Sequence, residues 1–123
     1  MAQELKATAR QIGSITVLDL QGDVTMFAEA ELTRAYHLAV DSGARDIVLD
    51  FAGTEYINSA GIAIIISLLT EARASGVSLV ISGLSSHYQK IFRMVGLTQY
   101  ADVFDTEEAA VTELKNRAAA EPA

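Results

Sequence analysis

The sequence predicts an α/β domain with a mostly parallel sheet of four or five strands, opened by an N-terminal hairpin and covered by about four helices. Short apolar segments rich in β-branched residues alternate with longer segments of helical periodicity, which favours parallel strands joined through helices. Single glycines or small polar residues stand where one segment gives way to the next. The 123 residues show no repeat and no linker, so we expect one domain spanning 1–123, with a core of about 4–117 and a frayed tail at 118–123.

The first half of the chain gives the order strand, strand, helix, strand. Residues 4–10 and 14–20 are predicted strands joined through Gly13, and the second is rich in β-branched and apolar residues. After a turn, apolar residues repeat at helical spacing from Met26 to about Asp41. Residues 46–51 then form a short apolar strand, which we expect to be buried on both faces.

The second half continues the alternation. A helix is predicted from the region of Ser59 to Ser75, followed by a strand at 77–81. A third helix is closed by Gly96 in the C′ position, and 100–104 is a weak edge strand. Thr106 is a good cap for the last helix, because the acidic residues after it suit the positive end of the helix dipole.

The composition excludes several classes of function. The chain has no cysteine, which removes disulfides, thiol nucleophiles and cysteine metal sites. The net charge is −7, with 16 acidic and 9 scattered basic residues, which argues against a nucleic-acid or anionic-membrane partner. The acidic charge serves either solubility or complementarity to a basic protein partner.

No feature of the sequence predicts export or insertion into a membrane. Residues 1–6 lack the charged and apolar blocks of a signal peptide. The longest apolar run, from Gly61 to Leu69, is about half of a membrane span and is interrupted by Ser67. We therefore expect a soluble cytoplasmic protein with no direct membrane insertion.

Catalytic and cofactor motifs are not visible. The two histidines, His37 and His87, have no spaced carboxylate partner and make a poor metal site. The glycines stand singly and form no nucleotide fingerprint, so neither a metal nor a cofactor is expected.

A phosphoaspartate receiver domain is a possible rival, since it also alternates strands and helices. Asp50 could then accept the phosphate, but such a site also needs a lysine at the end of a late strand. Lys6, Lys90 and Lys115 do not occupy such a position.

The junction at Ser59, where the strand at 46–51 gives way to a long helix, admits two interpretations. A hydroxyl at a helix start can cap free backbone N–H groups, although Asn58 could do so instead. The same N–H groups tolerate a phosphate, so Ser59 could also be a phosphorylation site. The small residues Ala60 and Gly61 would let the active site of another protein approach the hydroxyl.

Three segments, in the right order, resemble the STAS domains of bacterial anti-sigma factor antagonists. Residues 47–62 are similar to the family signature, in which an apolar strand and a short turn lead to Asp-Ser-Ser/Thr-Gly-Leu at a helix start. Residues 20–24 resemble the Gly-Glu-Leu-Asp turn of the family, and 91–97 resemble its Leu-Phe-x-x-x-Gly-Leu segment. The resemblance covers nearly the whole chain and implies the STAS fold.

The resemblance also implies a function. An anti-sigma factor serine kinase would bind the unmodified protein, leaving the sigma factor free, and would phosphorylate Ser59. Phosphorylation would release the complex, and a metal-dependent serine phosphatase would reset it; the domain itself would not be an enzyme. The expected partner-binding residues are Gly22, Asp23, Thr25, Asn58, Ser59, Ala60, Gly61 and Ile64.

The chain departs from the family pattern at three of these positions. Asn58 and Thr25 stand where the family usually has Asp, and Ala60 replaces the second hydroxyl. Asn keeps the shape and hydrogen bonding of Asp but loses a charge beside the acceptor. An alternative is therefore a STAS subunit that is not phosphorylated, in a lipid-transport ABC complex or a stress-signalling scaffold.

The apolar start of the helix after Ser59 also favours that alternative. Ile62, Ile65 and Ile66 can share the core face, so Ile64 should point elsewhere, toward a partner. The other interpretation is that the buried face is simply wider.

Overall fold

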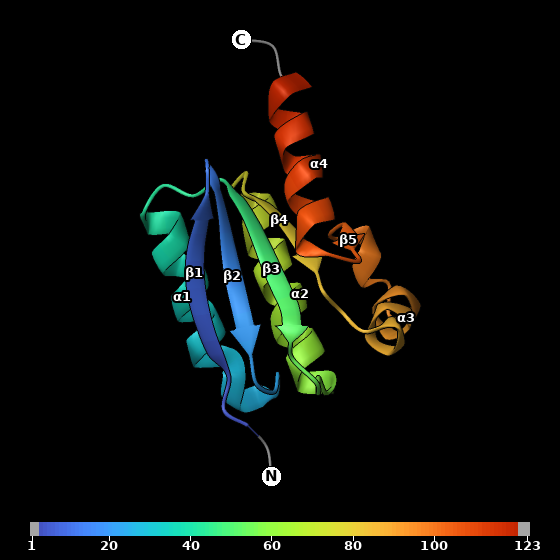
Figure 1. The fold of residues 1–123 in the computed structure, drawn as a ribbon. Coiled ribbons are helices and arrows are strands. Elements are labelled where there is room, and N and C mark those ends of the chain that lie inside the picture. Colours follow the sequence, from blue (N-terminus) through green and yellow to red (C-terminus); the bar gives the residue numbers. More distant parts are fainter. Residues whose placement is uncertain (1–2, 121–123) are drawn as a thin grey trace.

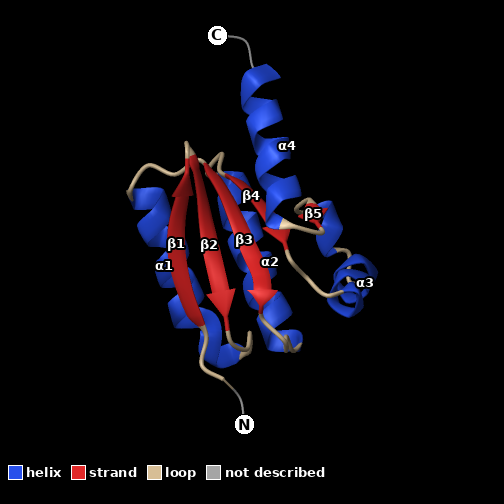
Figure 2. Ribbon diagram, in the orientation of Figure 1, coloured by secondary structure: helices blue, strands red, loops and turns tan. Residues whose placement is uncertain are grey.

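The computed structural model describes residues 3–120 as one sheet of five strands in the order β1-β2-β3-β4-β5, with helices on both faces (Figures 1 and 2). β1 pairs antiparallel with β2, and every other neighbouring pair is parallel. The strands are β1 (Lys6–Ile12), β2 (Ile15–Gln21), β3 (Asp46–Gly53), β4 (Ser78–Ser82) and β5 (Val103–Phe104). The helices are α1 (Glu29–Asp41), α2 (Ser59–Ala74), α3 (Ser86–Met94) and α4 (Glu107–Ala120), with 3-10 turns η1 (Met26–Ala28) and η2 (Leu97–Gln99).

This architecture confirms the predicted class, the N-terminal hairpin and the order of the elements. The predicted edge strand at 100–104 is shorter in the structure, because Tyr100 and Ala101 donate their N–H groups to the carbonyl of Leu97 in η2. Residues 118–120, which belong to the tail expected to fray, continue α4 in the structure and are all alanine, the strongest helix former. Residues 121–123 lie outside the described residues.

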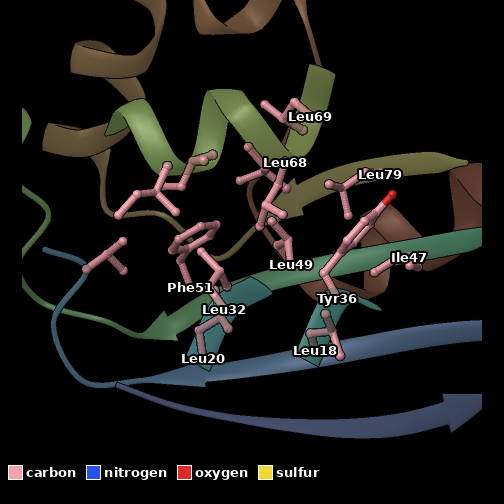
Figure 3. Close-up of a cluster of buried hydrophobic side chains, with 14 of the residues drawn as sticks. Leu18, Leu20, Leu32, Tyr36, Ile47, Leu49, Phe51, Leu68, Leu69 and Leu79 are labelled. Atoms are coloured by element: carbon pink, nitrogen blue, oxygen red, sulfur yellow. The ribbon is translucent and has the colours of Figure 1, made fainter. Parts of the chain in front are cut away.

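The two faces of the sheet are covered unequally. Residues that alternate along β2 and β3 point to opposite faces, so Leu18 and Leu49 join α1, α2 and α3 in the larger core (Figure 3). Val17 and Val48 instead face α4, with which they form a smaller cluster. Because both faces of the sheet are covered by apolar side chains, most residues of β2 and β3 are apolar rather than alternating with polar ones.

The loops that follow β2 and β3 meet at one end of the sheet. Both strands are parallel and neighbours, so their carboxyl ends lie side by side (Figure 1). Val24 and Ile57 then form an isolated parallel bridge that extends the pairing past the strands. This arrangement places the β2–η1 loop beside the start of α2.

Candidate functional site

The first turn of α2 is capped by Asn58. Its backbone is extended, with φ −100° and ψ −177°, and its Oδ1 accepts a hydrogen bond of 2.9 Å from the N–H of Gly61. The carbonyl of Asn58 accepts from the N–H of Ile62 at 2.9 Å. Of the two capping residues considered from the sequence, Asn58 is therefore the cap and Ser59 is not.

Ser59 is the first residue of α2, and its side chain is exposed. Within residues 3–120 its hydroxyl has no hydrogen-bond partner, because the cap hydrogen bond is made by Asn58. Ala60 beside it is also exposed. The Ser59 hydroxyl is thus available to another molecule without loss of a contact inside the fold.

Backbone hydrogen bonds hold the β2–η1 loop against the segment before Ser59. The N–H of Val24 donates to the carbonyl of Tyr56 at 2.9 Å, and the N–H of Asn58 donates to the carbonyl of Val24 at 3.2 Å. The N–H of Ile57 donates to the buried hydroxyl of Tyr88 at 2.9 Å. The Ser59 junction is therefore fixed both by the β2–η1 loop and by α3.

Three predicted partner-binding residues lie in the β2–η1 loop, and each has a contact within the fold. Gly22 is buried with φ +113°, and a Cβ there would lie 2.5 Å from the carbonyl oxygen of Glu4. The Asp23 carboxylate accepts from the N–H of Gln3 at 2.9 Å. The hydroxyl of Thr25 accepts from the N–H of Phe27 at 3.2 Å and caps η1. These residues shape the loop beside Ser59.

Gly61 has a different role from the one expected. The sequence suggested that its small size gives a partner access to Ser59, but Gly61 is buried. A Cβ at this position would lie 2.0 Å from the carbonyl oxygen of Val24. Gly61 is therefore needed so that α2 can approach the β2–η1 loop.

Of the two interpretations of Ile64, the wider buried face is confirmed and the prediction that its side chain points toward a partner is wrong. Ile64 is 9% exposed and belongs to the large core, whereas Ile62 and Ile66 are only partly buried. The buried face of α2 follows the helical i, i+3, i+4, i+7 pattern and is centred one residue earlier than expected. Its members are Gly61, Ile64, Ile65, Leu68, Leu69 and Ala72.

Comparison with known proteins identifies the family. A model of the STAS domain matches residues 6–110. The chain belongs to the STAS domain family. This confirms the fold expected from residues 47–62.

Three similar proteins extend this STAS assignment. BtrV of Bordetella bronchiseptica, described as an anti-sigma factor antagonist, is 29% identical over 111 residues, which are 90% of this chain and 96% of BtrV. An anti-sigma factor antagonist from Mycobacterium paratuberculosis has the same fold, with a TM-score of 0.78 at 15% identity over 91% of this chain and 95% of the other. The phosphorylated form of the Bacillus cell fate determinant SpoIIAA has a TM-score of 0.66 at 20% identity, covering 88% of this chain and 98% of SpoIIAA.

STAS anti-sigma factor antagonists are regulatory binding proteins rather than enzymes, in agreement with the absence of a catalytic motif in the sequence. Within residues 3–120, no helix has the length and apolar character needed to cross a membrane.

Sequence reasoning missed two features of this STAS domain near Ser59. The first is a group of exposed apolar side chains, Met26, Phe27 and Tyr56. The signal in the sequence that could have revealed this group is the apolar pair Met26 and Phe27, which follows Thr25 at the start of a helix. The second is the buried hydroxyl of Tyr88, which no sequence pattern connects to Ile57.

Asp50, the receiver candidate, lies with Asp19 and Glu107 on the α4 side of the sheet. Their carboxylate oxygens lie within 4.8 Å of one another, a spacing that could suit a cation. However, Arg10 donates to both Asp19, at 2.6 Å, and Glu107. Burial raises the pKa of Asp50, which its hydrogen bonds from the Ala52 N–H and the Ser82 hydroxyl only partly oppose. The ion pairs of Arg10 with Asp19 and Glu107 therefore link α4 to the sheet.

Proposed function

We propose that this STAS domain is an anti-sigma factor antagonist that acts by partner switching. The unphosphorylated form binds an anti-sigma factor serine kinase, which frees the sigma factor, and phosphorylation at Ser59 releases the complex. A metal-dependent serine phosphatase acting on the phosphorylated form restores binding. In this proposal the protein acts in the cytoplasm, where transcription is controlled.

The observation that supports the proposal most directly is the exposed hydroxyl of Ser59, which has no partner within residues 3–120 while Asn58 caps α2. The names of BtrV and SpoIIAA, and the phosphorylated state of SpoIIAA, support it independently. In the reaction, the Ser59 oxygen attacks the γ-phosphorus of ATP, ADP leaves, and a base of the kinase takes the hydroxyl proton. The phosphatase later transfers the phosphoryl group to water.

In this proposal we expect phosphorylation to change binding and not folding. A phosphate on Ser59 adds nearly two negative charges beside the positive end of the α2 dipole, where an anion is tolerated. The cap hydrogen bond from Gly61 to Asn58 does not involve the modified oxygen. The new charge would therefore act on a partner that covers Ser59, because that partner would have to desolvate it.

The test is to incubate the protein with ATP and an anti-sigma factor serine kinase of the same organism, and to locate phosphate by mass spectrometry. We expect modification of Ser59, none in Ser59→Ala, and normal modification in Ser67→Ala, an exposed serine on the same helix. Ser59→Ala should bind the kinase constitutively, and Ser59→Glu should bind weakly. Asn58→Asp, which restores the usual family residue, should be phosphorylated at least as fast.

Absence of phosphate on Ser59, or equal binding by Ser59→Glu and the wild type, would contradict the proposal. A stable complex insensitive to every Ser59 substitution would favour the alternative of a non-phosphorylated STAS subunit in a lipid-transport or scaffold assembly.

A further inference from the structure

Three large apolar side chains are exposed beside Ser59. Phe27 is 86% exposed, Met26 64% and Tyr56 50%. We refer to Met26, Phe27 and Tyr56 as the Phe27 surface. Single exposed apolar residues are common on proteins, but a group of this kind next to a candidate modification site calls for a function.

The backbone under the Phe27 surface is fixed. The N–H of Phe27 donates to the Thr25 hydroxyl, and the N–H of Ala28 donates to the Thr25 carbonyl at 2.9 Å. The nearest core residues before and after this pair in the sequence, Val24 and Ala28, are 0% and 2% exposed. Met26 and Phe27 are thus held outward between two core residues, so that little conformational entropy is lost when a partner covers them.

The two segments that carry the Phe27 surface adjoin the Ser59 junction. The carbonyl of Tyr56 accepts from the N–H of Val24, which joins the two segments that supply its side chains. The turn η1 contacts α2, and both lie at the same end of the sheet (Figure 1). A protein that covers Ser59 would therefore also meet the Phe27 surface.

The two segments that build this surface carry charge of one sign. Residues 11–33 and 46–72, which build the surface and the Ser59 junction, contain no Lys, Arg or His. The acidic residues nearest the apolar side chains in the sequence are Asp23, Glu29 and Glu55, of which Glu29 and Glu55 are exposed. A complementary partner therefore has an apolar pocket with Lys and Arg at its rim.

We propose that Phe27, supported by Met26 and Tyr56, is the anchor by which the anti-sigma partner holds this protein, in an apolar pocket rimmed by basic residues. This inference rests on the proposed function, because it assumes that the partner covers Ser59. It also explains the effect of a phosphate on Ser59, which would lie beside a desolvated apolar contact. There the cost of removing water from the phosphate opposes binding.

The test measures binding of the same anti-sigma factor kinase, by titration calorimetry and by association kinetics. Phe27→Ala should weaken binding at least about 30-fold, as expected for an aromatic hot spot. The matched controls are Met94→Ala and Leu38→Ala, which remove side chains that are 75% and 58% exposed elsewhere. These controls should change affinity less than about 2-fold, and all three variants should unfold like the wild type.

The contribution of acidic residues near the Phe27 surface is tested separately. Glu55→Lys should lower the association rate by about 3- to 10-fold at low salt and reduce its dependence on salt. Glu108→Lys, an exposed acidic residue on α4, is the matched control and should leave both unchanged.

The outcomes separate this inference from the proposed function. If Ser59→Glu weakens binding but Phe27→Ala does not, the proposal that Phe27 is the anchor is wrong, while the proposed phosphoswitch at Ser59 is supported. If Phe27→Ala weakens binding and Ser59→Glu does not, the anchor is supported and the phosphoswitch is wrong. Equal losses in Phe27→Ala and Met94→Ala would overturn the anchor, because exposed apolar area alone would then account for the effect.

Discussion

The protein has two exposed apolar surfaces that differ in charge. The Phe27 surface lies beside Ser59 in segments without a basic residue. A second surface, formed by Met94, Val95 and Tyr100 at the end of α3 and around η2, is 75%, 51% and 46% exposed. Residues 83–101, which contain it, have no Asp or Glu but include Lys90 and Arg93. We call it the Met94 surface.

This difference shows that apolar exposure alone does not identify the functional surface. Burial of either surface by a partner would be favourable, because each exposes apolar side chains. The two surfaces are complementary, however, to partners of opposite charge. The Phe27 surface lies next to Ser59, the proposed phosphoacceptor, so a phosphate on Ser59 would change this surface and leave the Met94 surface unaltered.

The two surfaces are nevertheless connected. Tyr88 of α3 accepts a hydrogen bond from the N–H of Ile57, two residues before Ser59. Substitutions at the residues that contact the Ser59 junction can measure how much each contact stabilises it.

The largest effect is expected from Gly61→Ala, which disrupts the support of the Phe27 surface. The new Cβ would meet the carbonyl oxygen of Val24 at 2.0 Å, which is backbone and cannot rotate away. We expect the free energy of unfolding in urea to fall by more than about 2 kcal/mol. Ala60→Gly, at the exposed neighbour, is the control and should cost no more than about 1 kcal/mol. Equal stability of Gly61→Ala and the wild type would show that the two segments are not locked together.

Tyr88→Phe tests the connection between the surfaces. The substitution keeps the ring in the core and leaves the N–H of Ile57 without its acceptor, which should lower the free energy of unfolding by about 1–3 kcal/mol. Hydrogen exchange of the Ile57 amide should also become faster. Tyr100→Phe, on the exposed Met94 surface, should change neither quantity. Unchanged exchange at Ile57 in Tyr88→Phe would mean that α3 does not restrain the junction.

Asn58→Ala and Ser59→Ala compare the cap with the candidate acceptor. Loss of the Asn58 side chain removes the hydrogen bond to Gly61 and should cost about 1 kcal/mol in thermal or urea unfolding. Ser59→Ala should remain within about 0.5 kcal/mol of the wild type, since its hydroxyl has no partner within residues 3–120. If Ser59→Ala lowered the free energy of unfolding more than Asn58→Ala does, Ser59 would have a structural role in the fold.

The fold could be predicted from the sequence because its main signals are local. Alternating apolar strands, helical periodicity and Gly96 with φ +79° after α3 all act within a few residues. The family signature placed Ser59 at the start of α2 for the same reason.

The details of the site depend on contacts that are distant in the sequence. Position 61 requires glycine because the carbonyl of Val24 approaches it closely. The buried hydroxyl of Tyr88 accepts a hydrogen bond from the N–H of Ile57. Ile64 was misplaced because two neighbouring choices of helical face both contain isoleucines, and only packing against the sheet decides between them. Phe27 looked like an ordinary helix residue until its exposure was known.

The smallest effect concerns acidic charge that belongs to neither surface. Asp50 lies on the α4 side of the sheet, and burial raises its pKa above the ordinary value of 3.8, with further contributions from Glu107 and Asp19. An acid whose pKa is raised by folding destabilises the fold when it is ionised. That penalty is fully present above the folded pKa and is lost as the pH falls through it toward the unfolded value.

Asp50→Asn should therefore stabilise the protein near pH 7 and give no advantage below about pH 4. Its amide oxygen can still accept from the Ala52 N–H and the Ser82 hydroxyl, while the amide N–H groups face Asp19 and Glu107. Urea unfolding at both pH values measures the difference, and Glu55→Gln, at an exposed acidic residue next to Tyr56 of the Phe27 surface, is the matched control. A gain that is the same at both pH values would show that the charge of Asp50 is not its cause. If Asp50→Asn also leaves kinase binding unchanged while Glu55→Lys slows it, the acidic charge that selects the partner is confined to the Phe27 surface.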